Sequence, residues 1–221
     1  MTMKNLSIIV FVLLIAAQKT FAQSPGYQQV MEQSVQTLDT TTRKSNLVKL
    51  TNTFERIAAR ETEEWLPYYY AAYTQVQQAY AEENVEAIDP LCDKATSFIE
   101  QADKISPHNS EIYCVKAMIE TARIRVDFME RGMKNVTRSN ELLQEAIGID
   151  PQNPRAYLLL GRNIAGTPEG FGGGFANARK LFEKAHLVFA DQSDATTTEP
   201  HWGRASLDQI LQKYATSQVT K

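Results

Sequence analysis

The sequence predicts an all-α fold built from repeated helical segments. A tyrosine followed four residues later by a small residue occurs at Tyr68, Tyr113 and Tyr157. Each of these tyrosines marks the first segment of one repeat copy. In the second segment of the copy, small and bulky residues recur at positions i, i+4 and i+7, the spacing of one helix face. No segment shows a convincing strand pattern. We therefore expect two helical segments in each copy and no β-sheet.

Residues 1–22 have the pattern of a secretory signal peptide. Lys4 is the only charge before a continuous apolar run over residues 8–17. That run is shorter than the roughly 20 residues that a membrane-spanning helix needs. Small residues around Phe21 predict cleavage after Ala22. We expect an exported protein, periplasmic or secreted, with no membrane span after cleavage; the alternative is an uncleaved N-terminal anchor helix.

Local start and stop signals place the elements along the rest of the chain. Asp89 and Asn153 each precede a proline, which predicts an N-cap residue with proline in the first turn. Pro107 and Pro151 follow expected helix ends. The expected helices are residues 26–39, 45–60, 63–82, 90–105, 109–127, 136–148, 154–165, 174–190 and 202–216.

The repeated positions resemble a known family. The most complete copy carries Tyr157, Leu160, Gly161, Ala178, Phe182 and Ala185. Its helix-end signature, Ala146 followed by Pro151, recurs one copy earlier as Ala102 and Pro107. Over about residues 45–190 the chain resembles the tetratricopeptide-repeat (TPR) family, and in particular exported bacterial TPR-like proteins. The resemblance implies an antiparallel helix-pair solenoid of about three to four degenerate repeats.

The repeats are longer than the 34 residues of the family. The three periods are 45, 44 and 39 residues. In each repeat, the distance from the small residue of the first segment to the small residue of the second segment is longer than in the family. The extra residues therefore lie between the two helices of a repeat. These insertions should emerge on one edge of the array, where solenoid proteins often add specificity.

The expected domain organisation has two parts after the signal peptide. Residues 23–195 form the TPR-like repeat domain, and residues 196–221 form a linker and a C-terminal capping helix. Apolar residues at helical spacing should pack this helix on the last repeat. They are Leu207, Ile210, Leu211 and Tyr214.

The TPR resemblance implies that the first helix of each pair lines a concave face. We expect this face to bind a protein or peptide partner through residues that are aromatic at one end and basic at the other. The candidate partner-binding residues are Tyr69, Tyr73, Met118, Arg155 and Arg162. The alternative is that the tyrosines pack between helices. The alternative function is a structural, self-assembling protein of the cell envelope, with homo-oligomers possible.

The sequence gives little support for a nucleic-acid, phosphate, metal or catalytic site. The net charge of −3 gives no basic surface for nucleic acid. The Gly170–Gly174 cluster lacks the strand and the Lys-Ser or Lys-Thr pair of a phosphate loop, so it predicts a sharp bend with Phe171 or Phe175 turned inward. The three histidines are isolated in sequence. We expect no catalytic residue, cofactor or metal; an enzyme site in the edge insertions is the remaining alternative.

The two cysteines are expected to be free and buried. The expected helix between Cys92 and Cys114 would separate them by about 15–20 Å at ~1.5 Å per residue. A disulfide requires Cα atoms within about 7 Å. A bridge between them is the less favoured alternative.

Overall fold

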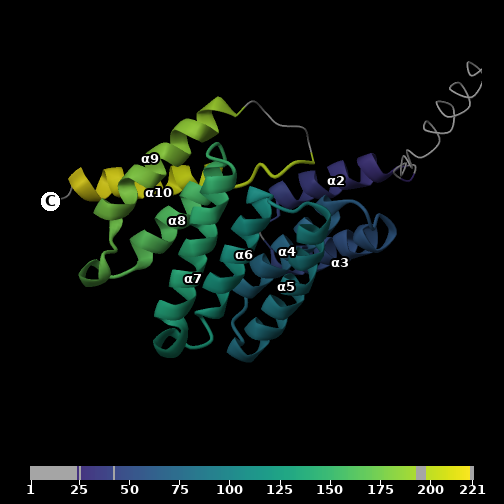
Figure 1. Ribbon diagram of the computed structural model, residues 1–221, viewed down its shortest axis with the longest axis horizontal. Coiled ribbons are helices and arrows are strands. Elements are labelled where there is room, and N and C mark those ends of the chain that lie inside the picture. Colours follow the sequence, from purple (N-terminus) through teal and green to yellow (C-terminus); the bar gives the residue numbers. More distant parts are fainter. Residues whose placement is uncertain (1–23, 25, 42, 193–197, 220–221) are drawn as a thin grey trace, which may run out of the picture.

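The computed structural model describes residues 24, 26–41, 43–192 and 198–219. All regular structure in these ranges is helical, which confirms the all-α prediction (Figure 1). The predicted signal peptide lies outside the described residues, as do residues 196 and 197 of the predicted linker. The elements are α2 (Tyr27–Asp39), α3 (Lys44–Arg60), α4 (Trp65–Tyr80), η1 (Val85–Ala87), α5 (Ile88–Ile105), α6 (Ser110–Arg123), α7 (Phe128–Ile149), α8 (Pro154–Gly166), η2 (Glu169–Phe171), α9 (Phe175–Asp191) and α10 (Arg204–Val219).

The helices pack in consecutive pairs. From α4 to α9, the closest pairings are α4 with α5, α6 with α7, and α8 with α9. The first helices of these pairs, α4, α6 and α8, also contact one another in turn. The result is the stacked array of helix pairs that the repeated pattern predicts.

The repeated tyrosines occupy equivalent positions. Tyr68, Tyr113 and Tyr157 are each the fourth residue of their helix, and all three are half-buried. The small residue four positions later is buried in each case. A Cβ atom added at Gly161 would lie 2.6 Å from the ring of Phe182, so a small residue there lets α8 and α9 approach closely.

One of the two expected proline-linked N-caps is present. Asn153 caps α8 by accepting a hydrogen bond from the backbone N–H of Arg155 at 2.9 Å. The prediction for Asp89 was wrong, because η1 leads directly into α5 and places Asp89 inside the first turn. Its carboxylate accepts hydrogen bonds from Arg123 and Arg131 instead.

The second insertion is mostly helix. α7 begins at Phe128 rather than near residue 136, because Asp127 caps an earlier start by accepting from the N–H of Glu130 at 2.9 Å. The insertion therefore adds about two helical turns to α7. The third insertion contains η2 and the glycine-rich bend before α9.

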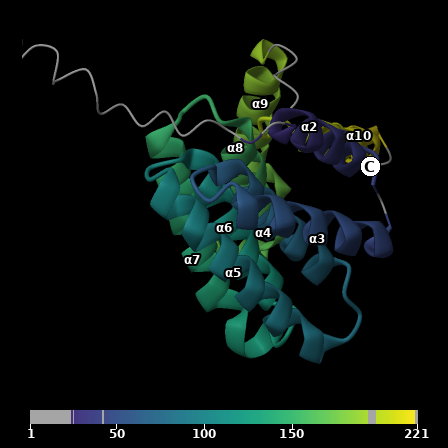
Figure 2. The same cartoon turned by 90° about the vertical axis from the view of Figure 1, so that its right-hand side faces the viewer.

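The C-terminal helix covers the last repeat, as expected. Leu207 of α10 is fully buried together with Phe182 and Phe189 of α9. Residues 198–203, which we call the strap, precede α10 and run along the array toward α4 and α2. Figure 2 shows α2 and α10 on the same side of the stacked helices.

Candidate functional site

An apolar groove lies at the edge where the second and third insertions emerge. It has a volume of about 400 Å³ and is lined by the start of α7 on one side and by the end of α8 and η2 on the other. Its apolar lining residues are Ile124, Phe128, Met129, Met133, Val136 and Phe171. The two insertions thus build a concave site between neighbouring repeats.

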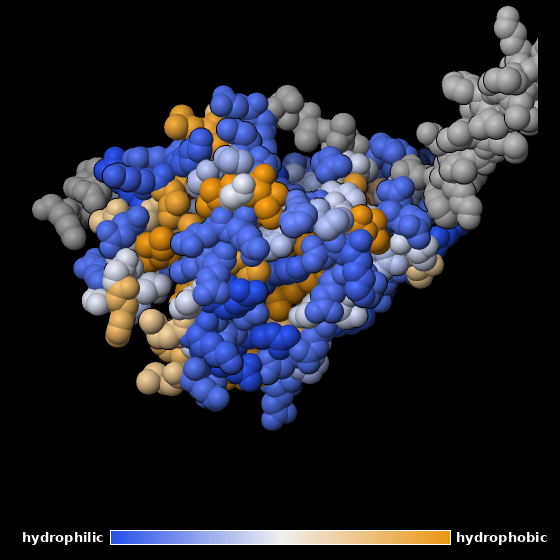
Figure 3. All heavy atoms as spheres, in the orientation of Figure 1, coloured by the Kyte–Doolittle hydropathy of each residue, from blue (hydrophilic) through white to orange (hydrophobic). Residues whose placement is uncertain are grey.

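The groove gathers the exposed apolar side chains of the molecule. Among the described residues, eight large hydrophobic side chains are exposed, and four of them line this groove. These are Phe128 (68% exposed), Met129 (90%), Met133 (58%) and Phe171 (70%). Figure 3 shows hydrophobic residues in orange at the lower left of the molecule. In the same orientation, Figure 1 shows the start of α7 and the end of α8 on that side. Clustered exposure of this kind marks a binding surface.

Local sequence explains how the groove walls form. Met129 and Met133 are four residues apart on α7 and so share one face of that helix. On the other wall, the backbone at Gly173 passes so close to Thr167 that an added Cβ would lie 1.9 Å from the Thr167 carbonyl oxygen. The resulting sharp bend leaves Phe171 exposed, while Phe175 stacks on Phe182 with ring centroids 5.6 Å apart.

Arg162 is the only charged side chain among the described residues that line the groove. Its polar neighbours already use their donors. Thr121 and Thr167 donate to backbone carbonyls at 3.0 and 2.8 Å, and the Asn163 amide donates to two side-chain oxygens at 2.8 and 2.9 Å. No hydrogen bond or ion pair joins Arg162 to the part of the chain that the structure describes. Its guanidinium donors are therefore available to a ligand.

An inner hollow of about 630 Å³ adjoins the groove, and Arg162 lines both cavities. Two phenols, Tyr73 and Tyr80, line this hollow. Burial raises the pKa of Tyr80 to about 12, and the positive charge of Arg162 opposes part of that increase. Burial also raises the pKa of Tyr73, again with Arg162 acting in the opposite direction. The field of Arg162 thus reaches the wall of the inner hollow.

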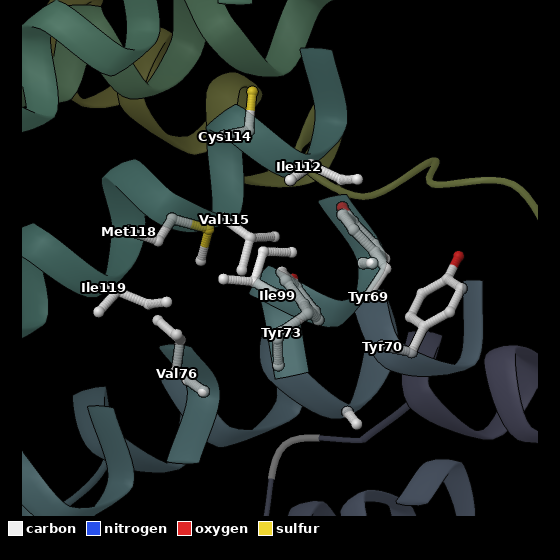
Figure 4. Close-up of a cluster of buried hydrophobic side chains, with 14 of the residues drawn as sticks. Tyr69, Tyr70, Tyr73, Val76, Ile99, Ile112, Cys114, Val115, Met118 and Ile119 are labelled. Atoms are coloured by element: carbon white, nitrogen blue, oxygen red, sulfur yellow. The ribbon is translucent and has the colours of Figure 1, made fainter. Parts of the chain in front are cut away.

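The expected concave-face residues have different surroundings from one another. Tyr69, Tyr73, Met118 and Arg155 are buried, and Arg162 is exposed. Figure 4 shows the two tyrosines and Met118 among buried apolar side chains of α4, α5 and α6. The structure therefore leaves one of the five candidate residues open to solvent.

The strap covers the aromatic part of the concave face. Trp202 donates its indole N–H to the Tyr69 hydroxyl at 2.9 Å, and its ring stacks on Tyr73 with centroids 5.1 Å apart. Arg155 lies over the same indole and forms an ion pair with Glu111, with its Nε 2.8 Å from both carboxylate oxygens. The aromatic and basic groups expected to bind a partner are here bonded within the chain.

The histidines and cysteines form no metal site among the described residues. His201 lies 2.9 Å from the Asp39 carboxylate, and His186 lies 4.0 Å from Asp208. Cys92 and Cys114 are buried and unpaired. In the part of the chain that the structure describes, no helix combines the length and apolar character needed to cross a bilayer.

A comparison with solved structures identifies a relative. The HusA haemophore from Porphyromonas gingivalis is 33% identical in sequence, with a TM-score of 0.78, over 86% of this chain and 93% of HusA. The chain belongs to the HusA family. No family model and no curated protein sequence matches it. A second solved structure, a MamA RS-1 ArsTM double mutant, is 12% identical over 79% of this chain and 100% of that chain, and its TM-score of 0.33 is too low to indicate a shared function.

The relative HusA is a haemophore. The predicted binding residues of this HusA relative include Arg162 of the groove but none of its four exposed apolar side chains. The available signal was the edge itself, because Phe128, Met129 and Met133 fall in or beside the second insertion and Phe171 falls in the third.

Proposed function

We propose that this HusA family member binds haem in the apolar groove between α7 and η2. The observation that supports this proposal is the concentration of exposed apolar side chains at one groove in a chain related to a haemophore. Haem is a flat, largely apolar ring with carboxylates along one edge. Apolar and aromatic walls with few polar groups suit such a ligand.

The composition of the groove suits a porphyrin. Its volume of about 400 Å³ falls within the usual range for small-molecule sites. Phe128 and Phe171 line it from opposite walls and supply aromatic surface for the ring. Met129 and Met133 add flexible, polarizable side chains that adapt to the outline of a ligand.

The ring, rather than the iron, should supply most of the affinity. The described lining residues of the groove include no histidine, cysteine or tyrosine. Among the side-chain classes that ligate haem iron, the described lining residues supply only the thioethers of Met129 and Met133. Apolar contact with the ring does not depend on a bound metal. We therefore expect metal-free protoporphyrin IX to bind in the same groove.

The test is a titration of the chain from residue 23 onward with haem and with protoporphyrin IX, followed by absorbance and by quenching of tryptophan fluorescence. Met129→Glu and Phe171→Glu place a charge against the ring and should weaken binding about tenfold or more. Leu187→Glu is the matched control, because Leu187 is 63% exposed and lies outside the groove. Unchanged affinity in both groove variants, or an equal loss in the control, would refute the groove as the haem site.

Export belongs to the same proposal. A haem carrier that captures its ligand outside the cytoplasm needs a leader, and residues 1–22 are predicted to supply one. Mass measurement of the protein recovered from culture fractions tests both cleavage after Ala22 and location.

A protein or peptide partner is a second proposal. A hollow of about 800 Å³ lies beside the strap and is lined by residues of α2, α4 and α10. Of its three tyrosines, Tyr70 and Tyr73 are buried and Tyr80 is half-buried. Affinity capture with wild type and with Tyr80→Glu tests it; equal recovery of every partner with the two baits counts against this face. Self-assembly of the chain is tested by light scattering over a range of concentrations.

A further inference from the structure

Arg162 stands where two cavities meet. It follows Gly161 on α8 and lines both the apolar groove and the inner hollow. Among the described lining residues of both cavities, it carries the only charge. No carboxylate among the described residues lines either cavity to neutralise it or to repel an anionic ligand.

A second arginine on the same helix shows how a structural arginine is held in this chain. Arg155 is 4% exposed, and Glu111 binds its guanidinium at 2.8 Å. Arg162 is exposed and has neither an ion pair nor a hydrogen bond with any residue that the structure describes. The side chains of Thr121, Asn163 and Thr167 already donate hydrogen bonds within the chain. The guanidinium of Arg162 therefore supplies the hydrogen-bond donors that a ligand in the groove can use.

We propose that Arg162 binds a carboxylate of the porphyrin and so fixes its orientation in the groove. This inference rests on the proposed haem site. The planar guanidinium presents two parallel N–H donors that match the two oxygens of a carboxylate. The carboxylate edge then lies toward the inner hollow, and the apolar ring lies against Phe128, Met129 and Phe171. The site selects porphyrins with a free carboxylate over esterified porphyrins.

The experiment is a two-by-two comparison of ligands and proteins. Protoporphyrin IX and its dimethyl ester share one ring and differ in their carboxylates. Each is titrated into the wild-type chain and into Arg162→Gln. Arg179→Gln is the matched control, since Arg179 is an exposed arginine of α9 that pairs with Glu183 and lies outside the groove.

The wild-type chain should bind the acid roughly tenfold more tightly than the ester, the magnitude of a lost hydrogen bond to a charged group. In Arg162→Gln the two ligands should bind with similar affinity, and Arg179→Gln should keep the wild-type preference. This cycle isolates the contact between Arg162 and the carboxylate.

Two results would overturn the assignment. Equal binding of acid and ester by the wild-type chain would show that no carboxylate is held. A preference that persists in Arg162→Gln would place the carboxylate on another group. In both cases the haem groove itself stands if Met129→Glu still weakens binding, whereas failure of the wild-type chain to bind either porphyrin rejects the proposed function together with this inference.

Discussion

The indole N–H of Trp202 donates to the hydroxyl of Tyr69 at 2.9 Å, although 133 residues separate the two in sequence. This bond anchors the strap on the concave face and joins the C-terminal part of the chain to α4. The Trp202 ring also stacks on Tyr73. The strap therefore contributes to the stability of the repeats that it covers.

Replacing Trp202 should destabilise the fold. Trp202→Ala removes the stacking and the hydrogen bond of a half-buried ring, and should lower the free energy of unfolding by about 2 kcal/mol. Trp202→Phe keeps an aromatic ring but not the N–H, and should cost about 1 kcal/mol. Urea denaturation measures both. Equal losses in the two variants would show that the ring contributes nothing beyond its hydrogen bond.

The contact between α8 and α9 depends on the absence of a side chain at Gly161. In Gly161→Ala the new Cβ would meet the Phe182 ring at 2.6 Å, so α8 and α9 must move apart and the free energy of unfolding should fall by about 1–3 kcal/mol. Gly148→Ala on α7 is the control. Among the described residues, no atom outside its own turn of helix lies within 4 Å of its added Cβ. Alanine favours the helix, so that variant should be neutral or slightly more stable. Thermal unfolding that is the same for the two variants would contradict the close approach.

The bend that presents Phe171 depends on Gly173. An added Cβ would lie 1.9 Å from the Thr167 carbonyl oxygen, a backbone atom that cannot move without opening the bend. Gly173→Ala should therefore weaken porphyrin binding as well as stability. At Gly170 an added Cβ meets nothing within 4 Å, so Gly170→Ala should bind normally. Fluorescence titration of both variants decides between them; normal binding by Gly173→Ala would mean that the bend does not shape the site.

The buried thiols should make the protein less stable at alkaline pH. Burial raises the pKa of Cys92 to about 11, against about 8.5 in an unfolded chain. Above about pH 8.5 the unfolded chain therefore loses the proton first, and the free energy of unfolding falls as pH rises. Cys92→Ala should make this fall shallower between pH 8 and 10, as measured by urea denaturation.

The same shift predicts low reactivity, because the thiolate is the reacting form of cysteine. Native protein at pH 8 should react slowly with a thiol reagent, whereas the chain in urea should react at both cysteines. Rapid labelling of two thiols in the native protein would contradict their burial.

Much of the fold follows from local pattern. The spacing of Tyr68, Tyr113 and Tyr157 predicts their shared position in α4, α6 and α8, because repeated packing imposes a repeated sequence. The predicted start of α7 is eight residues too late. The inserted helical turns have no equivalent in the other repeats, so aligning the repeats does not reveal them. The capping residue Asp127 was the local signal that identifies the true start.

The candidate site is harder to predict, because it depends on contacts between distant segments. The insertions place Phe128 and Phe171 at one edge of the array, but their local sequence does not reveal that they line one groove, since 43 residues separate them. The burial of Tyr69 and Tyr73 likewise depends on Trp202, which the repeat pattern does not include. Arg162 is the expected site residue that does reach the groove, because helical spacing fixes its face of α8.

The contact of His201 with Asp39 of α2, at 2.9 Å, couples the two ends of the array across 162 residues. In an open solenoid each unit touches only its neighbours, so the terminal units can melt independently. Here the strap, which leads into α10, contacts α2, so the two ends of the array are linked. Truncation of the chain near its C-terminus, or a fusion there, should thus change the stability of α2. Denaturation should be one cooperative transition in which the repeats do not unfold one by one.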